Sequence, residues 1–213
     1  MRRMFLACSV FSAMSAAPAA AQVEYPVDLR IGGITGGTRR DVSVNNEVTD
    51  RLDASVKGFE AYLGAKGGGV GLGGRILNGT YGTDDFTQRE ARLFVGENWF
   101  RLEGAYGERS LVGTDSTVLF IRAGARSIVQ VGGTGVSISI SGAKTFQGDF
   151  SHSRSDGSRK PDGWEGESSV FYTAPKIPIY VQLGYRADYF KFQGRAEHMN
   201  GIVFGMGIWL GGR

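Results

Sequence analysis

The chain has 213 residues, and its formal net charge of +3 includes Arg2 and Arg3 at its start. Without these two arginines the charge is near +1, so the composition gives no support for nucleic-acid binding. The 34 glycines and the lack of a long apolar stripe at helical spacing predict a sheet-rich chain without a substantial helix.

Residues 1–21 have the features of a secretory signal peptide. A charged start is followed by a short apolar region and by a cleavage site of small residues that ends at Ala21. A transmembrane anchor would need about 20 apolar residues, and this run is shorter. The only cysteine, Cys8, lies in this segment, so we expect no disulfide in the single domain formed by residues 22–213.

Segments that alternate between apolar and polar residues begin directly after this leader. Alternation places successive side chains on opposite faces, which is the pattern of a strand. One face of each segment is apolar, as Leu29, Phe59 and Leu72 illustrate, and the other carries charged residues. In the first half of the chain we predict strands at 27–35, 56–66, 70–76, 90–95 and 100–106.

The second half continues the same pattern up to its last strand. In that strand Ile202, Phe204 and Met206 belong to one continuous apolar face, and the opposite face is mostly glycine. Everything upstream is expected to pair into one sheet that this strand closes. The predicted strands of this half are at 117–131, 136–141, 170–174, 179–188 and 201–210.

The connections between these strands alternate between long and short. Short turns are expected around Gly67, Gly96, Gly132 and Pro175. The longer, polar connections are predicted at 36–53, 78–87, 108–116, 147–165 and 194–200. This asymmetry is typical of an up-and-down barrel with short turns at one end and longer loops at the other. Ten strands are predicted, and eight strands are the alternative.

Aromatic residues concentrate toward the two ends of the predicted strands, as in the aromatic girdles of membrane barrels. The girdle at the short turns would contain Tyr25, Trp99, Tyr180 and Trp209. The girdle at the long loops would contain Tyr81, Phe86, Phe146, Trp164 and Tyr189.

With its leader, ten alternating strands and apolar final strand, the chain resembles the small bacterial outer-membrane β-barrel proteins as a class. The resemblance covers nearly all of residues 22–213 and is one of architecture, not of one family's motif. It implies an all-β, up-and-down antiparallel transmembrane β-barrel that reaches the bacterial outer membrane after secretion through the inner membrane. The implied partners are outer-membrane lipid, lipopolysaccharide and the barrel-insertion machinery, with no nucleic acid, cofactor or metal.

The faces opposite the apolar stripes carry charges. An arginine that faces lipid at the middle of a membrane costs roughly 2–4 kcal/mol, so these groups must face the interior or be solvated. The interior of a narrow barrel is mostly filled by side chains, and we therefore expect a filled, charged lumen with a structural or surface-binding role. Because arginines outnumber acids, a narrow channel for small solutes is the alternative. The predicted network contains Asp28, Arg30, Glu60, Arg75, Glu90, Arg92, Arg101, Glu103, Arg122, Arg126, Arg186 and Asp188.

The long segment 147–165 is the other candidate site. Its cations Arg154, Arg159 and Lys160 are hypothesised to contact lipopolysaccharide phosphates, together with Arg39, Arg40 and His198 from neighbouring loops. A solvated loop is the alternative interpretation.

The sequence leaves two other functions open. His152, with Ser151 and Asp149 nearby, allows a hydrolase that acts on lipid or peptide, but such clusters are more often turn chemistry, and we expect no enzymatic activity. If the apolar stripes faced inward, the chain would instead be a secreted soluble β-barrel that binds a ligand.

Overall fold

The computed structural model describes residues 27–44, 47–65, 69–81, 84–97, 99–110, 117–147, 160–192 and 195–210, so the predicted signal peptide lies outside the described part. Ten strands make up this part: β1 (Val27–Val44), β2 (Glu47–Ala65), β3 (Gly69–Tyr81), β4 (Asp84–Gly96), β5 (Phe100–Ser110), β6 (Thr117–Val131), β7 (Val136–Gln147), β8 (Asp162–Thr173), β9 (Ile179–Phe192) and β10 (Arg195–Leu210). Among the described residues, none form a helix with the length and apolar character needed to span a membrane.

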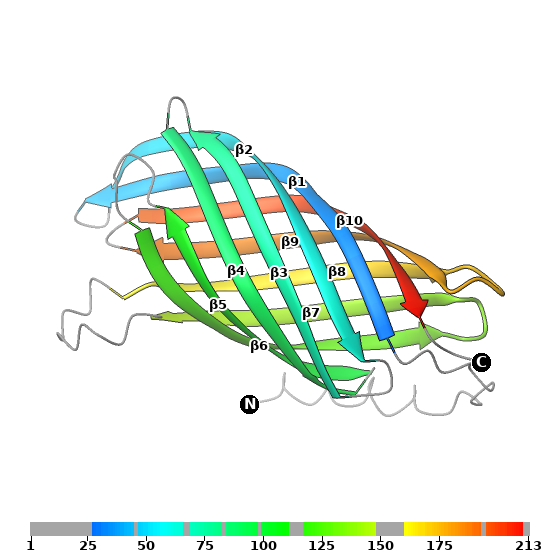
Figure 1. Cartoon of the computed structure of the whole chain (residues 1–213). Coiled ribbons are helices and arrows are strands. Elements are labelled where there is room, and N and C mark those ends of the chain that lie inside the picture. The colour runs from blue at the N-terminus through cyan, green and yellow to red at the C-terminus, as the bar shows by residue number, and fades with distance from the viewer. Residues whose placement is uncertain are drawn as a thin grey trace, which may run out of the picture.

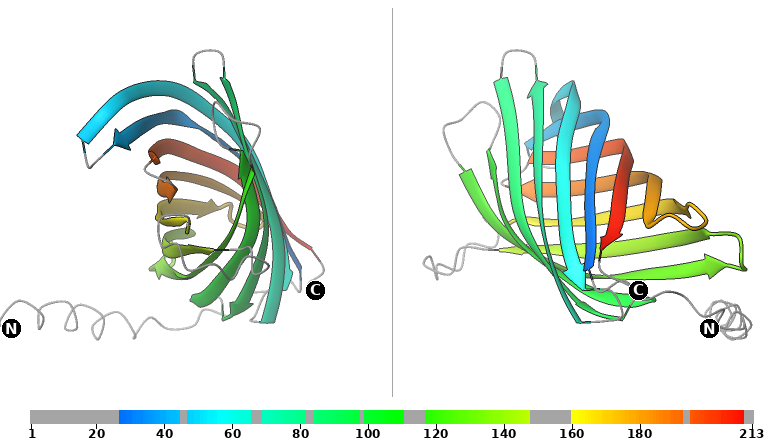
Figure 2. Two further views of the ribbon diagram at one scale, coloured as in Figure 1. Left: turned by 90° about the vertical axis from the view of Figure 1, so that its left-hand side faces the viewer. Right: turned by 45° about the vertical axis from the view of Figure 1, so that its right-hand side comes forward.

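The ten strands form one closed barrel in which each strand pairs with its sequence neighbours (Figure 1). Every pairing is antiparallel, and β1 closes the barrel against β10, with Val27 opposite Leu210. Strands on the near side cross those on the far side at a large angle, as expected for strands tilted around a barrel (Figures 1 and 2). The predicted all-β, up-and-down antiparallel barrel of ten strands is confirmed, and the eight-stranded alternative is wrong.

The two ends of the barrel differ in their connections. Residues 66–68, 97–99, 132–135 and 174–178 make the connections at one end, which we call the turn end. Gly132 and Gly135 have positive φ values of 57° and 76° there, a left-handed conformation that glycine adopts without strain. The opposite end, called the loop end, holds the connections at 45–46, 82–83, 111–116, 148–161 and 193–194.

Most of the long loops predicted at the loop end are wrong. Only two residues separate β1 from β2, β3 from β4 and β9 from β10, because these strands continue through the polar segments. The outward face turns polar there, but the inward face continues to bury residues such as Thr38, Tyr81 and Met199. Hydrogen-bonded ladders with one solvated face are stable, so the end of an apolar stripe does not mark the end of a strand.

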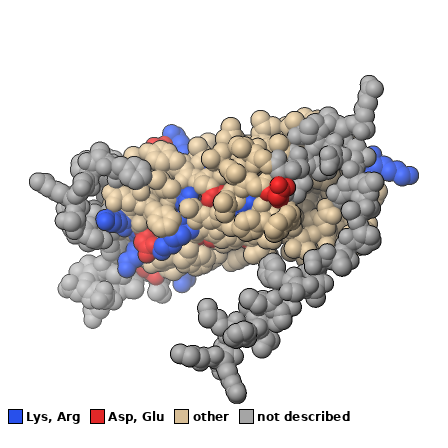
Figure 3. Space-filling view, turned by 90° about the horizontal axis from the view of Figure 1, so that it is seen from below, with Lys and Arg blue, Asp and Glu red and all other residues tan. Residues whose placement is uncertain are grey.

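The outer wall of the barrel is apolar over its turn-end and middle parts. Leu72, Ile140 and Leu183 are each at least 60% exposed. In Figure 3 the visible face is mostly tan, with most blue and red atoms toward the loop end and a few near the middle. On β10 the outward apolar residues run from Ile202 to Leu210, within the 9–11 residues with which a tilted strand crosses a membrane.

The predicted aromatic girdles are only partly correct. Trp99, Phe146 and Trp164 are exposed on the outside. Tyr81 and Phe86 are buried in the interior instead, and so is Tyr180, which packs against Trp209 with ring centroids 5.1 Å apart. Tyr25 lies outside the described residues. A position near a strand end therefore did not determine which face an aromatic residue occupies.

The seam between β1 and β10 is unusually tight at Gly36. A Cβ atom on Gly36 would lie 2.0 Å from the carbonyl oxygen of Asn200 and 2.4 Å from Cα of Gly201. We expect Gly36→Val to lower the free energy of unfolding by about 1–3 kcal/mol, because the two strands must separate to admit the side chain. Urea unfolding of the refolded barrel in detergent measures this loss.

Gly104 supplies the matched control for this substitution. It lies within β5, and an added Cβ would meet nothing within 4 Å. Gly104→Val should therefore change the free energy of unfolding by less than about 0.5 kcal/mol. Equal losses in the two variants would show that the seam is not a close backbone approach.

Candidate functional site

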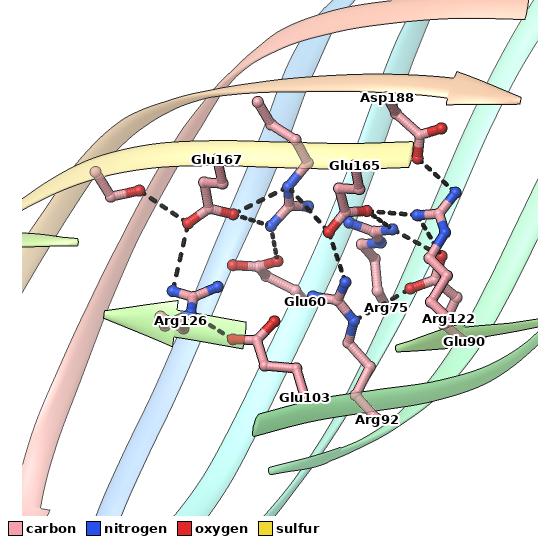
Figure 4. Close-up of polar contacts among 12 residues, drawn as sticks. Glu60, Arg75, Glu90, Arg92, Glu103, Arg122, Arg126, Glu165, Glu167 and Asp188 are labelled. Atoms are coloured by element: carbon pink, nitrogen blue, oxygen red, sulfur yellow. Dashed lines mark hydrogen bonds and ion pairs between the residues drawn. The ribbon is translucent and has the colours of Figure 1, made fainter. Parts of the chain in front are cut away.

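The middle of the barrel interior holds one continuous network of charged side chains (Figure 4). Every member has a side chain no more than 8% exposed. Ion pairs connect five arginines and six carboxylates into this network: Arg75, Arg92, Arg122, Arg126, Arg186, Glu60, Glu90, Glu103, Glu165, Glu167 and Asp188.

Glu165 on β8 is the carboxylate that contacts the most arginines in this network. It accepts hydrogen bonds from Arg92 at 2.6 Å, from Arg122 at 2.5 Å and from Arg75. Arg186 lies 4.0 Å away. The three donors come from β3, β4 and β6, so one carboxylate connects strands on different sides of the lumen. Without it, several guanidinium groups would be buried with too little negative charge.

Arg186 on β9 organises the part of the network nearer the turn end. Its guanidinium donates to Glu60 at 2.9 Å and to Glu167 at 3.0 Å. Glu167 also accepts from Ser169 at 2.8 Å and from Gln182 at 3.1 Å. Since buried charges are stable only when paired and hydrogen-bonded, these neutral donors help to keep Glu167 ionised inside the barrel.

The three remaining predicted charges lie nearer the turn end. Asp28 accepts a hydrogen bond from the Tyr180 hydroxyl at 2.7 Å. The guanidinium groups of Arg30 and Arg101 lie 5.3 Å and 5.6 Å from the centre of the Tyr62 ring, within cation–π range. The interior at the turn end is therefore lined by arginines and tyrosines.

Toward the loop end apolar side chains join the polar ones in the interior. Two buried clusters occupy it, and Arg109 lies between them with its guanidinium 4.5 Å from the ring centre of Phe86 and 4.6 Å from that of Phe190. Arg109 also donates to Glu197 and, at 2.5 Å, to Gln88. The first cluster contains Ile34, Val56, Leu77, Tyr81, Phe86, Met199 and Val203, and the second Val118, Phe120 and Phe190. Together with Arg109, we call them the apolar cap.

The structure adds acidic residues that the sequence prediction missed. Glu165 is predicted to lie in a loop and Glu167 is absent from the predicted network, yet both are buried at the centre of the network. The structure also buries Arg40, Arg109 and Glu197, so the interior set comprises nine arginines and eight acids. The excess of arginine that favoured an anion path is therefore smaller than predicted. Val170 and Tyr172 are exposed, and alternation back along β8 places positions 165 and 167 on the opposite face. The alternation could therefore have placed both glutamates inward.

The predicted loop surface is only partly within the described residues. Arg154, Arg159 and His152 lie outside them, and Lys160 is exposed beside β8. The inclusion of Arg40 in an outward surface is wrong, because it is buried with its guanidinium 5.6 Å from the ring centre of Tyr81. Alternation along β1 turns Arg40 inward and Arg39 outward.

Among the described residues, no group of histidine, cysteine or acidic side chains is arranged to hold a metal ion. The carboxylates of the interior are instead occupied by guanidinium groups at hydrogen-bond distance. Such an arrangement holds the barrel walls together and leaves its charges little freedom to move.

No protein-family model and no curated protein matches the sequence. Among solved structures, the chain is similar to Neisserial surface protein A, at 12% identity and a TM-score of 0.39 over 85% of this chain and 97% of that chain. It is also similar to the translocator domain of the autotransporter NalP from Neisseria meningitidis, at 11% identity and a TM-score of 0.34 over 94% and 92%. OpdQ of Pseudomonas aeruginosa matches at 8% identity and a TM-score of 0.24 over 85% and 97%.

Proposed function

We propose that this chain is an integral β-barrel of a bacterial outer membrane whose closed lumen gives it a structural or surface-binding role. The observation that carries the proposal is the inverted distribution of side chains. Arg75, Arg122 and Arg186 are almost completely buried, whereas Leu72, Ile140 and Leu183 point outward and are largely exposed. Water does not stabilise such a surface, but the hydrocarbon of a membrane does.

The same distribution argues against a secreted soluble barrel that binds a ligand. That function requires the apolar stripes to face inward, and they face outward. An outer-membrane barrel should migrate differently on SDS gels before and after boiling, because the folded form resists the detergent. Purification as a soluble monomer without detergent would contradict the membrane proposal.

A filled interior also argues against an open channel. At the level of the apolar cap, Leu77, Phe120 and Val203 are completely buried, and the ion-pair network lies beside it toward the turn end. Large aqueous channels need about 16 strands, and this barrel has ten.

We therefore expect liposomes that contain the refolded barrel to swell in small sugars no faster than empty liposomes. The physical reason is that both the network and the apolar cap occupy the path of a solute. Liposomes with a general porin serve as the positive control. Rapid swelling with the refolded barrel would support the narrow-channel alternative instead.

The absence of enzymatic activity stays a prediction, since His152 and its neighbours lie outside the described residues.

Binding of lipopolysaccharide by Arg154, Arg159 and Lys160 likewise stays a proposal. A deletion of residues 154–162 tests it. Binding to cells or to lipopolysaccharide should fall, while the protein should still migrate differently on SDS gels before and after boiling.

A further inference from the structure

A row of aromatic and basic side chains crosses the outside of the barrel wall near the loop end. In ladder register it runs from Lys144 through Trp164 and Tyr189 to His198 and Arg39. Trp164 and Tyr189 stack with ring centroids 6.5 Å apart and planes at 29°, and the His198 ring lies 4.8 Å from Tyr189. Trp164 is half exposed, so its ring is available to a molecule outside the barrel.

Lysines lie in or beside this row on β7, on β9 and just before the start of β8. Lys144 donates to Asp162, Lys191 stands opposite Asp162 in the ladder, and Lys160 is exposed next to β8. The hydrogen bond from Lys144 holds the pKa of the Asp162 carboxyl below its usual value, so this group is ionised at neutral pH. Asp162 therefore faces two lysines, Lys144 and Lys191, and the summed charge of these three groups is positive. We call Lys144, Asp162, Trp164, Tyr189 and Lys191 the wall patch.

Small residues lie next to the wall patch, one row closer to the turn end. Gly142, Gly166 and Ala187 are neighbours in the ladder. A Cβ atom on Gly142 or Gly166 would meet nothing closer than 3.8 Å, so packing within the barrel does not require glycine at either position. The outer surface of the barrel therefore carries little side-chain bulk at these positions. Farther along the same three strands lie the exposed apolar side chains of Ile138, Val170 and Leu183.

We propose that the wall patch binds the phosphorylated headgroup of an outer-leaflet lipid, with one of its acyl chains lying over the small residues. This inference rests on the proposed position in the membrane. Lysine makes strong charge-assisted hydrogen bonds to phosphate oxygens, and tryptophan and tyrosine favour the level where headgroups meet hydrocarbon. Free phosphate would contact the lysines alone. A lipid would contact the lysines, the aromatic rings and the small residues together.

The test compares lipid binding to the wild-type barrel and to the double variant K144Q/K191Q. Both are refolded in detergent, and binding of bisphosphorylated lipid A is measured by native mass spectrometry. We expect the variant to bind about tenfold more weakly, since it loses two charge-assisted contacts. Dephosphorylated lipid A should bind both proteins equally weakly, and an excess of inorganic phosphate should not displace the lipid.

The matched control is K57Q/R89Q, which removes two exposed cations from β2 and β4 on the opposite side of the barrel. It should bind the phosphorylated lipid like the wild type. Equal binding by K144Q/K191Q and the wild type, or equal loss in both double variants, would overturn the inference. Each protein is first checked for heat-modifiable migration, so a failure of the barrel proposal appears there, before any lipid is added.

Discussion

Replacing Glu165 by Ala should lower the free energy of unfolding by about 3–5 kcal/mol, the usual cost of breaking a buried ion pair from one side. The carboxylate is 5% exposed and accepts hydrogen bonds from Arg75, Arg92 and Arg122. Its removal leaves these guanidinium groups desolvated with less negative charge around them. Urea unfolding in detergent, followed by tryptophan fluorescence, measures the change.

Two further variants make this prediction specific. Glu165→Gln keeps the shape of the side chain and loses its charge, so its loss should lie between those of the wild type and the alanine variant. Glu108→Gln removes a carboxylate from an exposed pair with Arg89 at 3.3 Å and should cost less than about 1 kcal/mol. If Glu165→Ala cost no more than Glu108→Gln, the network would not stabilise the barrel.

Replacing Phe120 by Ala should cost about 3–5 kcal/mol without opening the lumen. Phe120 is completely buried, its ring packs edge-on against Phe190 at 5.7 Å, and the Arg122 guanidinium lies 5.1 Å from its centre. The substitution leaves a cavity in the apolar cap. Urea unfolding measures the loss of stability, and single-channel recording in planar bilayers tests the lumen.

Phe146→Ala is the control, because Phe146 stands on the outside of the neighbouring strand and is half exposed. Its loss should be clearly smaller than that of Phe120→Ala. No current is expected from either variant, because the ion-pair network still fills the lumen. A steady current from Phe120→Ala alone would show that the apolar cap is the sole barrier.

The alternation of the sequence predicted faces well and strand ends poorly. Leu72 and Ile140 lie outward as their patterns indicate, because a lipid-facing wall requires apolar side chains at every second position. Beyond the apolar stripe, both faces of a strand can be polar, as at Thr38 on β1, and the pattern then resembles a loop. The continuing ladder at that level depends on pairing with β2 and β10, which local sequence does not encode.

The candidate site was predictable in its composition and not in its connections. Period-two alternation places Arg186 and Glu60 in the interior, but it gives only their face and not their height along the barrel. Their contact at 2.9 Å depends on the register of every intervening pair of strands. The position of Arg109 between two phenylalanine rings depends on that register as well, and no local pattern indicates it.

The interior contacts join positions that are far apart in the chain, and this affects how the protein folds. Arg186 and Glu60 are separated by 126 positions, and Arg75 and Glu165 by 90. Hairpins between neighbouring strands can form early, whereas these contacts require most of the chain to be in place. Until β1 meets β10, the interior charges must remain hydrated. Barrel closure and the loss of that water therefore belong to the same late, slow step of assembly.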